Sequence, residues 1–260
     1  MTIRARRAAR EEVWAVAESH QDGRVPTAGK FVFDFREGDK DQKDLLGGKG
    51  ANLAEMTRLG LPVPPGFTIT TEACRYYLER GRAPDQLRVQ VTMALRQLED
   101  EVGRRLGDSH DPLLVSVRSG AKYSMPGMME TVLNVGLNDH SVLGLVEAAG
   151  DERFAWDSYR RLIQMFGKTV LGVDGEVFAH ALDAAKERKG VKTDVALEAS
   201  DLKKLVEEFK AVVVKHTGRE FPQDPRHQLD LATRSVFDSW NTDRARLYRR
   251  DVRDRDLLHP

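Results

Sequence analysis

The fold is decided by residues 45–56, which read LLGGKGANLAEM. Before them, residues 31–35 alternate three phenylalanines with Val32 and Asp34, a period-two pattern that predicts a strand. After the glycines, apolar residues recur at the spacing of one helix face and stop at Gly60. The stretch therefore predicts a strand, a glycine-rich turn and a helix in succession.

The turn, Gly47-Gly48-Lys49-Gly50, combines residue types that suit a phosphate ligand. Glycines allow backbone N–H groups to approach an anion, a helix N-terminus adds partial positive charge, and a lysine supplies a mobile cation. The turn is not a Walker A loop, because the G-x-x-x-x-G-K-[ST] spacing is absent. From these residues alone, phosphate binding and a plain turn with a solvated Lys49 are equally good interpretations.

Further strands and helices are predicted outward from this stretch by the same periodicities. The expected strands cover 67–71, 113–117 and 131–135, and the expected helices lie near 72–81, 84–106, 151–170, 200–213 (with Ser200 as N-cap) and 229–240. We divide the chain into an N-terminal extension (1–29), an α/β subdomain (30–137), a helical subdomain (138–223), a helix returning to the α/β subdomain (224–250) and a tail (251–260). The predicted fold class is α+β.

Composition narrows the class of protein. The 260 residues carry 41 Lys+Arg and 41 Asp+Glu, so the net charge is zero and a globally basic nucleic-acid binder is excluded. The single cysteine, Cys74, excludes an intrachain disulfide and is expected to be a small apolar packing residue. No apolar run approaches the roughly 20 residues that cross a bilayer. We therefore expect a cytoplasmic protein that binds neither nucleic acid nor membrane.

A second candidate for anion binding is Arg118, at the end of the predicted apolar strand 113–117. Open α/β sheets place ligands at the carboxyl ends of their strands, and the planar guanidinium binds phosphate in a bidentate manner. The competing interpretation, an arginine paired with a core carboxylate, has about even weight. The loop 124–131 adds three methionines, which adapt to flat ligands such as a purine face, although core packing is their commoner role.

The remaining polar residues give weaker signals. Arg161 borders the apolar stripe of the helix near 151–170 while Arg160 points further round, and most arginines in such positions lie on the surface. Glu55, Glu130 and Asp157 have no partner at a spacing diagnostic of an acid/base pair or a magnesium site. The seven histidines show no metal-ligand spacing, so no metal site is identifiable.

Several runs together resemble the pyruvate, phosphate dikinase family. They are LLGGKGANLAEM (45–56), GLPVPPGFT (60–68), DPLLVSVRSGA (111–121), SMPGMMET (124–131) and FAWDSYRRLIQM (154–165), followed by WN and YRR within 240–250. The match covers about residues 30–250. Phosphoenolpyruvate synthase and rifampicin phosphotransferase share the glycine-lysine loop and the Val-Arg-Ser run, whereas the Met-Pro-Gly-Met-Met segment favours the dikinase.

The resemblance implies the first half of an ATP-grasp-like domain, a mixed sheet with an inserted helical subdomain. In the family this domain binds ATP with Mg²⁺ and passes its β,γ-phosphates to a histidine on a separate swivelling domain. The histidine then delivers phosphate to pyruvate in a third, barrel domain, so that ATP, phosphate and pyruvate give AMP, diphosphate and phosphoenolpyruvate.

The resemblance also implies roles for individual residues. By matching position, Lys49, Arg118 and Arg161 should hold ATP phosphates, and Gly127 and Met129 should line the nucleotide pocket. Further candidate ligands are Gly47, Gly48, Lys122 and Thr131, with Lys122 standing where the family often has arginine.

The chain also departs from the family pattern. Residues 251–260 replace the expected start of the second half, whose acidic residues bind magnesium, and no histidine lies in a Thr-x-His phosphocarrier motif. We expect the nucleotide-binding N-terminal part of a dikinase, weak in ATP binding and inactive alone, completed by a second polypeptide. The alternatives are a non-catalytic nucleotide-binding or regulatory protein, a truncated remnant, and part of a phosphoenolpyruvate synthase-like water dikinase.

Overall fold

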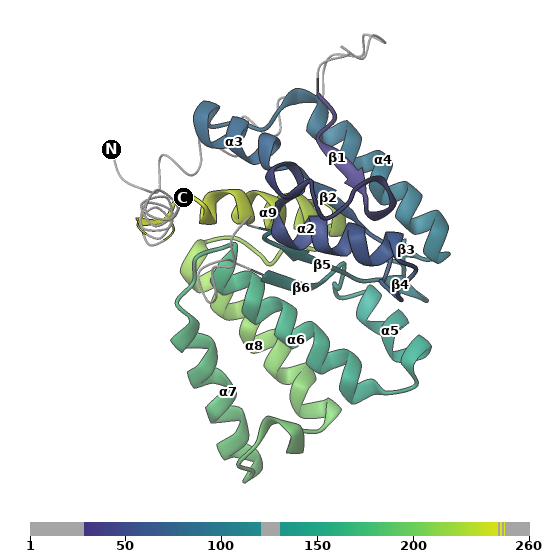
Figure 1. The fold of residues 1–260 in the computed structure, drawn as a ribbon. Coiled ribbons are helices and arrows are strands. Elements are labelled where there is room, and N and C mark those ends of the chain that lie inside the picture. Colours follow the sequence, from purple (N-terminus) through teal and green to yellow (C-terminus); the bar gives the residue numbers. More distant parts are fainter. Residues whose placement is uncertain (1–28, 121–130, 244, 246, 248–260) are drawn as a thin grey trace. The chain divides into compact units, whose positions relative to one another are not determined.

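The computed structural model describes residues 29–120, 131–243, 245 and 247, as helices joined to short strands (Figure 1). These residues form two compact units. The first contains the described residues up to Glu101 together with Gly120, and the second contains Val102–Ser119 and the described residues from Thr131 onward. The predicted extension, most of the loop 124–131 and the tail lie outside the described residues.

The first unit is built on a short antiparallel pair of strands. β1 (Val32–Asp34) pairs with β2 (Phe67–Ile69), so that Phe33 faces Thr68 across the strands. The helices of the unit are η2 (Phe35–Glu37), α2 (Lys43–Arg58), α3 (Thr71–Arg80) and α4 (Asp85–Val102). Leu46, Ala51 and Ala54 of α2 form a small core with Phe33 and Leu45. The predicted strand and helix are therefore present, but α2 begins at Lys43, so the glycine-rich turn lies inside the helix and not before it.

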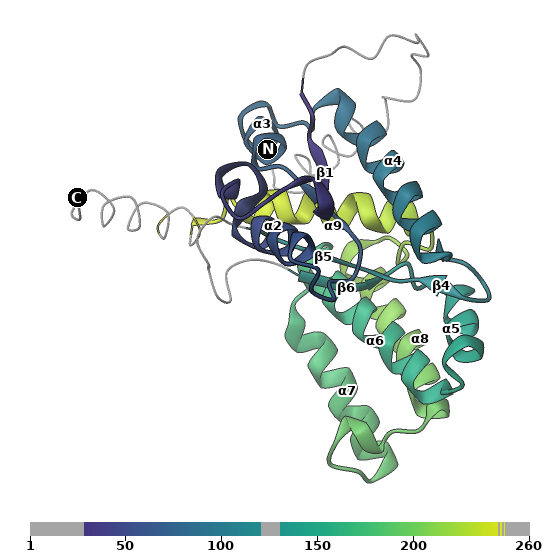
Figure 2. The same cartoon turned by 45° about the vertical axis from the view of Figure 1, so that its right-hand side comes forward.

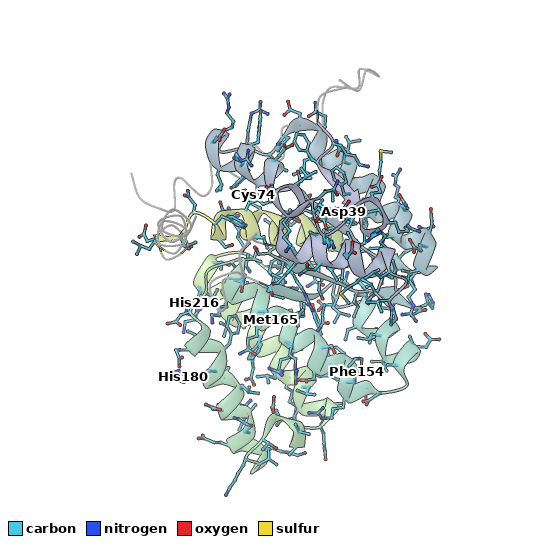
Figure 3. All side chains as sticks on the ribbon, in the orientation of Figure 1. Asp39, Cys74, Phe154, Met165, His180 and His216 are labelled. Carbon is cyan, nitrogen blue, oxygen red and sulfur yellow. The ribbon has the colours of Figure 1, made fainter. Side chains whose placement is uncertain are left out.

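Helix α4 is tied to the start of β1 by one side chain. The Oε1 atom of Gln90 accepts hydrogen bonds from the backbone N–H groups of Phe31 and Val32, at 2.7 and 3.1 Å. On α3, the Cys74 side chain is buried, as expected for a packing residue (Figure 3).

The second unit contains two further strand pairs. β3 (Arg105–Leu106) and β4 (Pro112–Leu113) are parallel, while β5 (Val115–Arg118) and β6 (Thr131–Val135) are antiparallel. The last residue of β5, Arg118, faces the first residue of β6, Thr131. The predicted strand 113–117 is thus divided at Leu114 between two sheets, whereas the predicted strand 131–135 is confirmed.

The rest of the second unit is helical. Its helices are α5 (Ser141–Ala149), α6 (Glu152–Thr169), α7 (Gly175–Lys189), η3 (Asp194–Ala196), α8 (Ala199–Thr217) and α9 (Pro225–Ser239). α6 and α8 lie side by side (Figures 1 and 2), and α6 also packs against α5 and β6. Edge-to-face ring contacts add to the packing of this unit: Phe166 of α6 contacts Phe221, which follows α8, at 5.5 Å, and Phe178 of α7 contacts Phe209 of α8 at 5.0 Å.

Helices and small sheets in one chain confirm the α+β prediction. The strands of the described residues pair as three two-stranded sheets. The prediction of Ser200 as N-cap of α8 is wrong, because the helix begins at Ala199 and its N-cap is Glu198, whose backbone N–H donates to the Asp201 carboxylate at 3.1 Å. The boundaries at 137 and 223, drawn from changes in sequence character, stay a prediction.

Within the described ranges, no helix has both the length and the apolar character needed to cross a membrane.

Candidate functional site

The glycine-rich turn interrupts α2 rather than preceding it. Gly47 has φ 70° and ψ 168°, a conformation that divides Lys43–Arg58 into a first turn and a main helix. A Cβ atom at Gly47 would lie 1.5 Å from the carbonyl oxygen of Gly120, within the same unit. Gly47 therefore serves two physical needs, a positive φ and the close approach of a second backbone segment.

Lys49 follows this turn with an exposed side chain. No ion pair joins it to any residue in the described part of the chain. Gly120 lies beside it, since a Cβ atom built on Gly120 would be 3.7 Å from the Cβ of Lys49. The turn thus offers an unneutralised cation next to a second glycine, which is what an anion site requires.

Arg118 is also exposed, at the end of β5. No described carboxylate pairs with it, so the interpretation of Arg118 as a partner of a core carboxylate finds no support among the described residues. The next residue, Ser119, is 2% exposed, and its Oγ has no hydrogen-bond partner among the described residues. Buried hydroxyl groups normally have a hydrogen-bond partner, so the Ser119 hydroxyl is unusual. Ser119 was not among the ligands predicted from the sequence.

Of the two arginines of α6, Arg161 lies on the surface as expected, whereas Arg160 does not. Arg160 is buried, with 3% of its side chain exposed, and its Nε and Nη2 atoms donate to Asp157 Oδ1 at 2.9 and 2.6 Å. Arg160 can be buried because Asp157 and Gln164 accept its hydrogen bonds. Arg161 is 56% exposed, and its Nε lies 2.8 Å from the other oxygen of Asp157.

Asp157 therefore contacts both arginines of α6, a pairing that the sequence analysis did not predict. It was set aside as a single carboxylate, yet it lies three and four residues before the two arginines, the spacing at which helix side chains meet. That spacing was the available signal.

The other predicted ligands are only partly described. Gly127, Met129 and Lys122 lie outside the described residues, while Gly48 is half-buried in the turn and Thr131 is half-buried opposite Arg118. The structure brings Lys49 together with Gly47 and Gly120 in one unit, and Arg118 with Thr131 in the other. Convergence of Lys49, Arg118 and Arg161 on one cleft stays a prediction.

No group of three or more metal-ligand residues occurs in the ranges that the structure describes. Among the histidines, His180 on α7 and His216 on α8 are exposed (Figure 3), and the Nδ1 of His216 lies 2.9 Å from the carbonyl oxygen of Val212.

Glu55 pairs with Arg58 at 2.7 Å, and this hydrogen-bonded guanidinium lowers the pKa of the Glu55 carboxyl.

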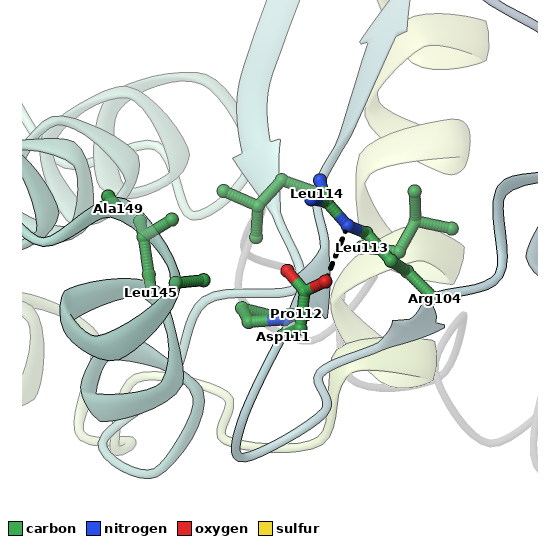
Figure 4. Close-up of a pocket in the computed structure, with 8 residues that line it drawn as sticks. Arg104, Asp111, Pro112, Leu113, Leu114, Leu145 and Ala149 are labelled. Carbon is green, nitrogen blue, oxygen red and sulfur yellow. Dashed lines mark hydrogen bonds and ion pairs between the residues drawn. The ribbon is translucent and has the colours of Figure 1, made fainter.

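A cavity of about 320 Å³ lies in the second unit between β4 and α5 (Figure 4). Arg104 and Asp111 form an ion pair of 2.8 Å at its wall, and leucine and alanine side chains make up most of the remaining lining. None of the predicted ligands that the structure describes lines this cavity.

Comparison with known proteins identifies the family. The model of the pyruvate phosphate dikinase AMP/ATP-binding domain matches residues 43–91 and 78–256. The chain belongs to this family. The chain is 51% identical to pyruvate, phosphate dikinase 1, chloroplastic, of Arabidopsis thaliana over 240 residues, which are 90% of this chain and 25% of the relative.

Two further relatives agree. Pyruvate, phosphate dikinase 2 of Zea mays is 55% identical over 223 residues (84% of this chain, 25% of the relative). Pyruvate, phosphate dikinase of Clostridium symbiosum is 52% identical over 223 residues (85% of this chain, 26% of the relative). The chain thus spans about a quarter of the length of these relatives. The resemblance inferred from the sequence is confirmed, and ATP is the ligand that membership of the dikinase AMP/ATP-binding family implies.

Proposed function

We propose that the chain binds ATP through Lys49, Arg118 and Arg161, which hold the phosphate groups. The observation that carries this proposal is the state of the first two side chains, which are exposed and not neutralised by any described carboxylate. An unpaired surface cation beside a glycine turn suits a polyanion, because charge-assisted hydrogen bonds to phosphate are stronger than neutral ones. Only Ser119 separates Arg118 from Gly120, the residue that contacts the turn of Gly47.

The neighbouring residues complete the proposed site. Gly47 and Gly48 leave room for phosphate oxygens to approach backbone N–H groups. Gly127 and Met129 line the nucleotide pocket, where a methionine side chain adapts to the flat base. Lys122 and Thr131 are further candidate ligands.

Magnesium enters this proposal as the counterion that ATP brings with it. The described residues offer no carboxylate cluster for it, so no residue of the described part is assigned to magnesium.

The reaction that we propose for the whole protein is that of pyruvate, phosphate dikinases. The chain supplies positioned cations and backbone donors, which do most of the work in phosphoryl transfer. In this proposal a second polypeptide carries the phosphorylated histidine and the pyruvate site. The proposed location of the protein is the cytoplasm. We expect the 260-residue polypeptide, assayed alone, to bind ATP without converting pyruvate to phosphoenolpyruvate.

Calorimetry with Mg-ATP tests the proposed function. Lys49→Ala and Arg118→Ala should each weaken binding by about tenfold or more, since a hydrogen bond to a charged group contributes on the order of 1.5–3 kcal/mol. Arg188→Ala is the matched control, because Arg188 is 56% exposed on α7 and pairs with Glu208. Equal affinity of wild type, Lys49→Ala and Arg118→Ala, or no binding by the wild type, contradicts the proposal.

A further inference from the structure

We propose that Asp157 is a positioning residue, whose carboxylate is anchored by the buried Arg160 and directs the guanidinium of Arg161 toward the phosphates of ATP. This inference rests on the proposed function, in which Arg161 is a phosphate ligand. It assigns a role to a carboxylate that itself touches no ATP.

The geometry of α6 allows one carboxylate to serve two arginines. Asp157, Arg160 and Arg161 are three and four residues apart, so their side chains meet on one side of the helix. Each oxygen of the Asp157 carboxylate contacts a different arginine. Oδ1 accepts from Nε and Nη2 of Arg160 at 2.9 and 2.6 Å, and Oδ2 lies 2.8 Å from Nε of Arg161.

Arg160 fixes the carboxylate in place. Its side chain is only 3% exposed, its Nη1 donates to Gln164 Oε1 at 2.9 Å, and its Nη2 lies 3.7 Å from Asp194 Oδ2. Because Arg160 also contacts Gln164 and Asp194, its guanidinium holds the Asp157 carboxylate in one position. Asp157, with 11% of its side chain exposed, is therefore a rigid support rather than a mobile surface acid.

Among the described residues, the contact found for Arg161 is at its inner nitrogen. The contact uses Nε, and the side chain is 56% exposed, so both terminal nitrogens stay available to a ligand. These are the nitrogens that form the fork for a phosphate. Arg161 shares the single charge of Asp157 with Arg160, which also lies 3.7 Å from Asp194. The arrangement thus orients Arg161 without neutralising it.

A double-mutant cycle tests whether Asp157 acts through Arg161. Mg-ATP affinity is measured by calorimetry for the wild-type chain, Asp157→Asn, Arg161→Ala and the double variant. Asp157→Asn should weaken binding about two- to fivefold when Arg161 is present, the range of a partly exposed ion pair, and should have no effect in the Arg161→Ala background. Asp183→Asn is the matched control, since Asp183 pairs with Lys186 three residues along α7 at 2.6 Å.

Asp157→Asn also leaves Arg160 buried without its carboxylate, which destabilises folded proteins. The variant Asp157→Asn/Arg160→Met removes both buried charges and should weaken ATP binding as much as Asp157→Asn does. A spectroscopic readout is the ¹⁵N-resolved Nε–Hε signal of Arg161 in the ATP-free chain. It should shift in both Asp157 variants and stay in place in Asp183→Asn.

The outcomes separate the two ideas. If the wild-type chain binds no Mg-ATP, the proposed function fails and the inference falls with it. If ATP binds and Arg161→Ala has no effect, Arg161 is not a ligand and the inference is overturned. If Asp157→Asn weakens binding equally with and without Arg161, or the Nε–Hε signal does not move, Asp157 has only a structural role and the inference alone fails.

Discussion

Gly47 occupies a backbone conformation that is close to exclusive to glycine, with φ 70° and ψ 168°. We expect Gly47→Ala to lower the free energy of unfolding by about 3 kcal/mol or more. Backbone strain of this kind costs on the order of 1–3 kcal/mol, and the new methyl group would also lie 1.5 Å from the carbonyl oxygen of Gly120. Urea unfolding of wild type and variant measures the difference.

Gly60→Ala is the control for a positive φ without a close backbone contact. Gly60 has φ 73°, but a Cβ atom there meets nothing within 4 Å, so its substitution should cost about 1–2 kcal/mol. If both alanine variants lose the same stability, the contact between Gly47 and Gly120 contributes nothing, and the turn does not need its first glycine for close approach.

Asp34 makes stability depend on pH through one arginine. Arg36 donates from Nε and Nη2 to Asp34 at 2.8 and 2.9 Å, and this hydrogen bonding holds the pKa of Asp34 below its usual value. A lowered folded-state pKa stabilises the protein above the unfolded pKa of about 3.9, and the contribution disappears as pH falls through the folded pKa. At pH 7, Asp34→Asn should cost up to about 1 kcal/mol, since Arg36 is half-exposed.

Urea unfolding at pH 7, 5 and 3 measures this contribution. Asparagine still accepts the backbone N–H of Arg36, so the substitution keeps this cap and removes the charge together with the hydrogen bond from Arg36 Nη2. The difference between wild type and Asp34→Asn should shrink toward pH 3 and should be smaller in an Arg36→Met background, where the backbone N–H of residue 36 and Lys30 still favour the carboxylate. A difference that grows on acidification contradicts the assigned sign.

At the scale of elements, Gln228 of α9 joins three segments of the second unit. Its Oε1 accepts from the backbone N–H of Gly136 at 3.0 Å, and its Nε2 donates to the carbonyls of Leu137 and Pro222 at 2.9 and 2.7 Å. The residue is fully buried. Gln228→Leu keeps the volume but leaves these backbone groups unsatisfied, so we expect a loss of about 3 kcal/mol in the free energy of unfolding.

Gln97→Leu is the matched control, because Gln97 is exposed on α4 and the same substitution there should change stability by no more than about 0.5 kcal/mol. Comparable unfolding midpoints for the two variants in urea argue that α9 is held by its apolar contacts alone.

Hydrophobic periodicity predicted the helices whose apolar residues all lie on one buried face. α6 is the clearest case, since Ala155, Tyr159, Leu162, Ile163 and Phe166 are fully buried at the expected spacing. The start of α8 was missed because a serine has a strong capping preference, whereas here Asp201 accepts the N–H of Glu198 and the helix starts before Ser200. Local preference gives way where a neighbouring side chain already caps the helix.

The sequence was enough to predict the cationic residues of the candidate site, but not the contacts that their neighbours make. Lys49 and Arg118 stood out as residues, and their exposure agrees with a ligand role. The burial of Arg160 could not be read from the helix pattern, because it depends on Gln164 and on Asp194 from another segment. The kink at Gly47 likewise depends on Gly120, which is remote in sequence.

At the scale of the whole molecule, a net charge of zero conceals where the charge acts. The proposed phosphate ligands are divided between the two units, with Lys49 in the first and Arg118 and Arg161 in the second. A ligand bound by residues of both units stabilises both, by about 2.7 kcal/mol at a concentration 100 times its Kd. ATP should therefore stabilise elements of both units that carry a proposed ligand.

Hydrogen exchange in the presence and absence of Mg-ATP tests this expectation. Amides of α2 in the first unit and of α6 in the second should both exchange more slowly with ATP, because each helix carries a proposed ligand. In Arg118→Ala, protection should fall in α2 as well as in α6, although Arg118 belongs to the second unit. Protection confined to one unit would show that ATP binds there alone, and the division of phosphate ligands between Lys49 and the two arginines would be wrong.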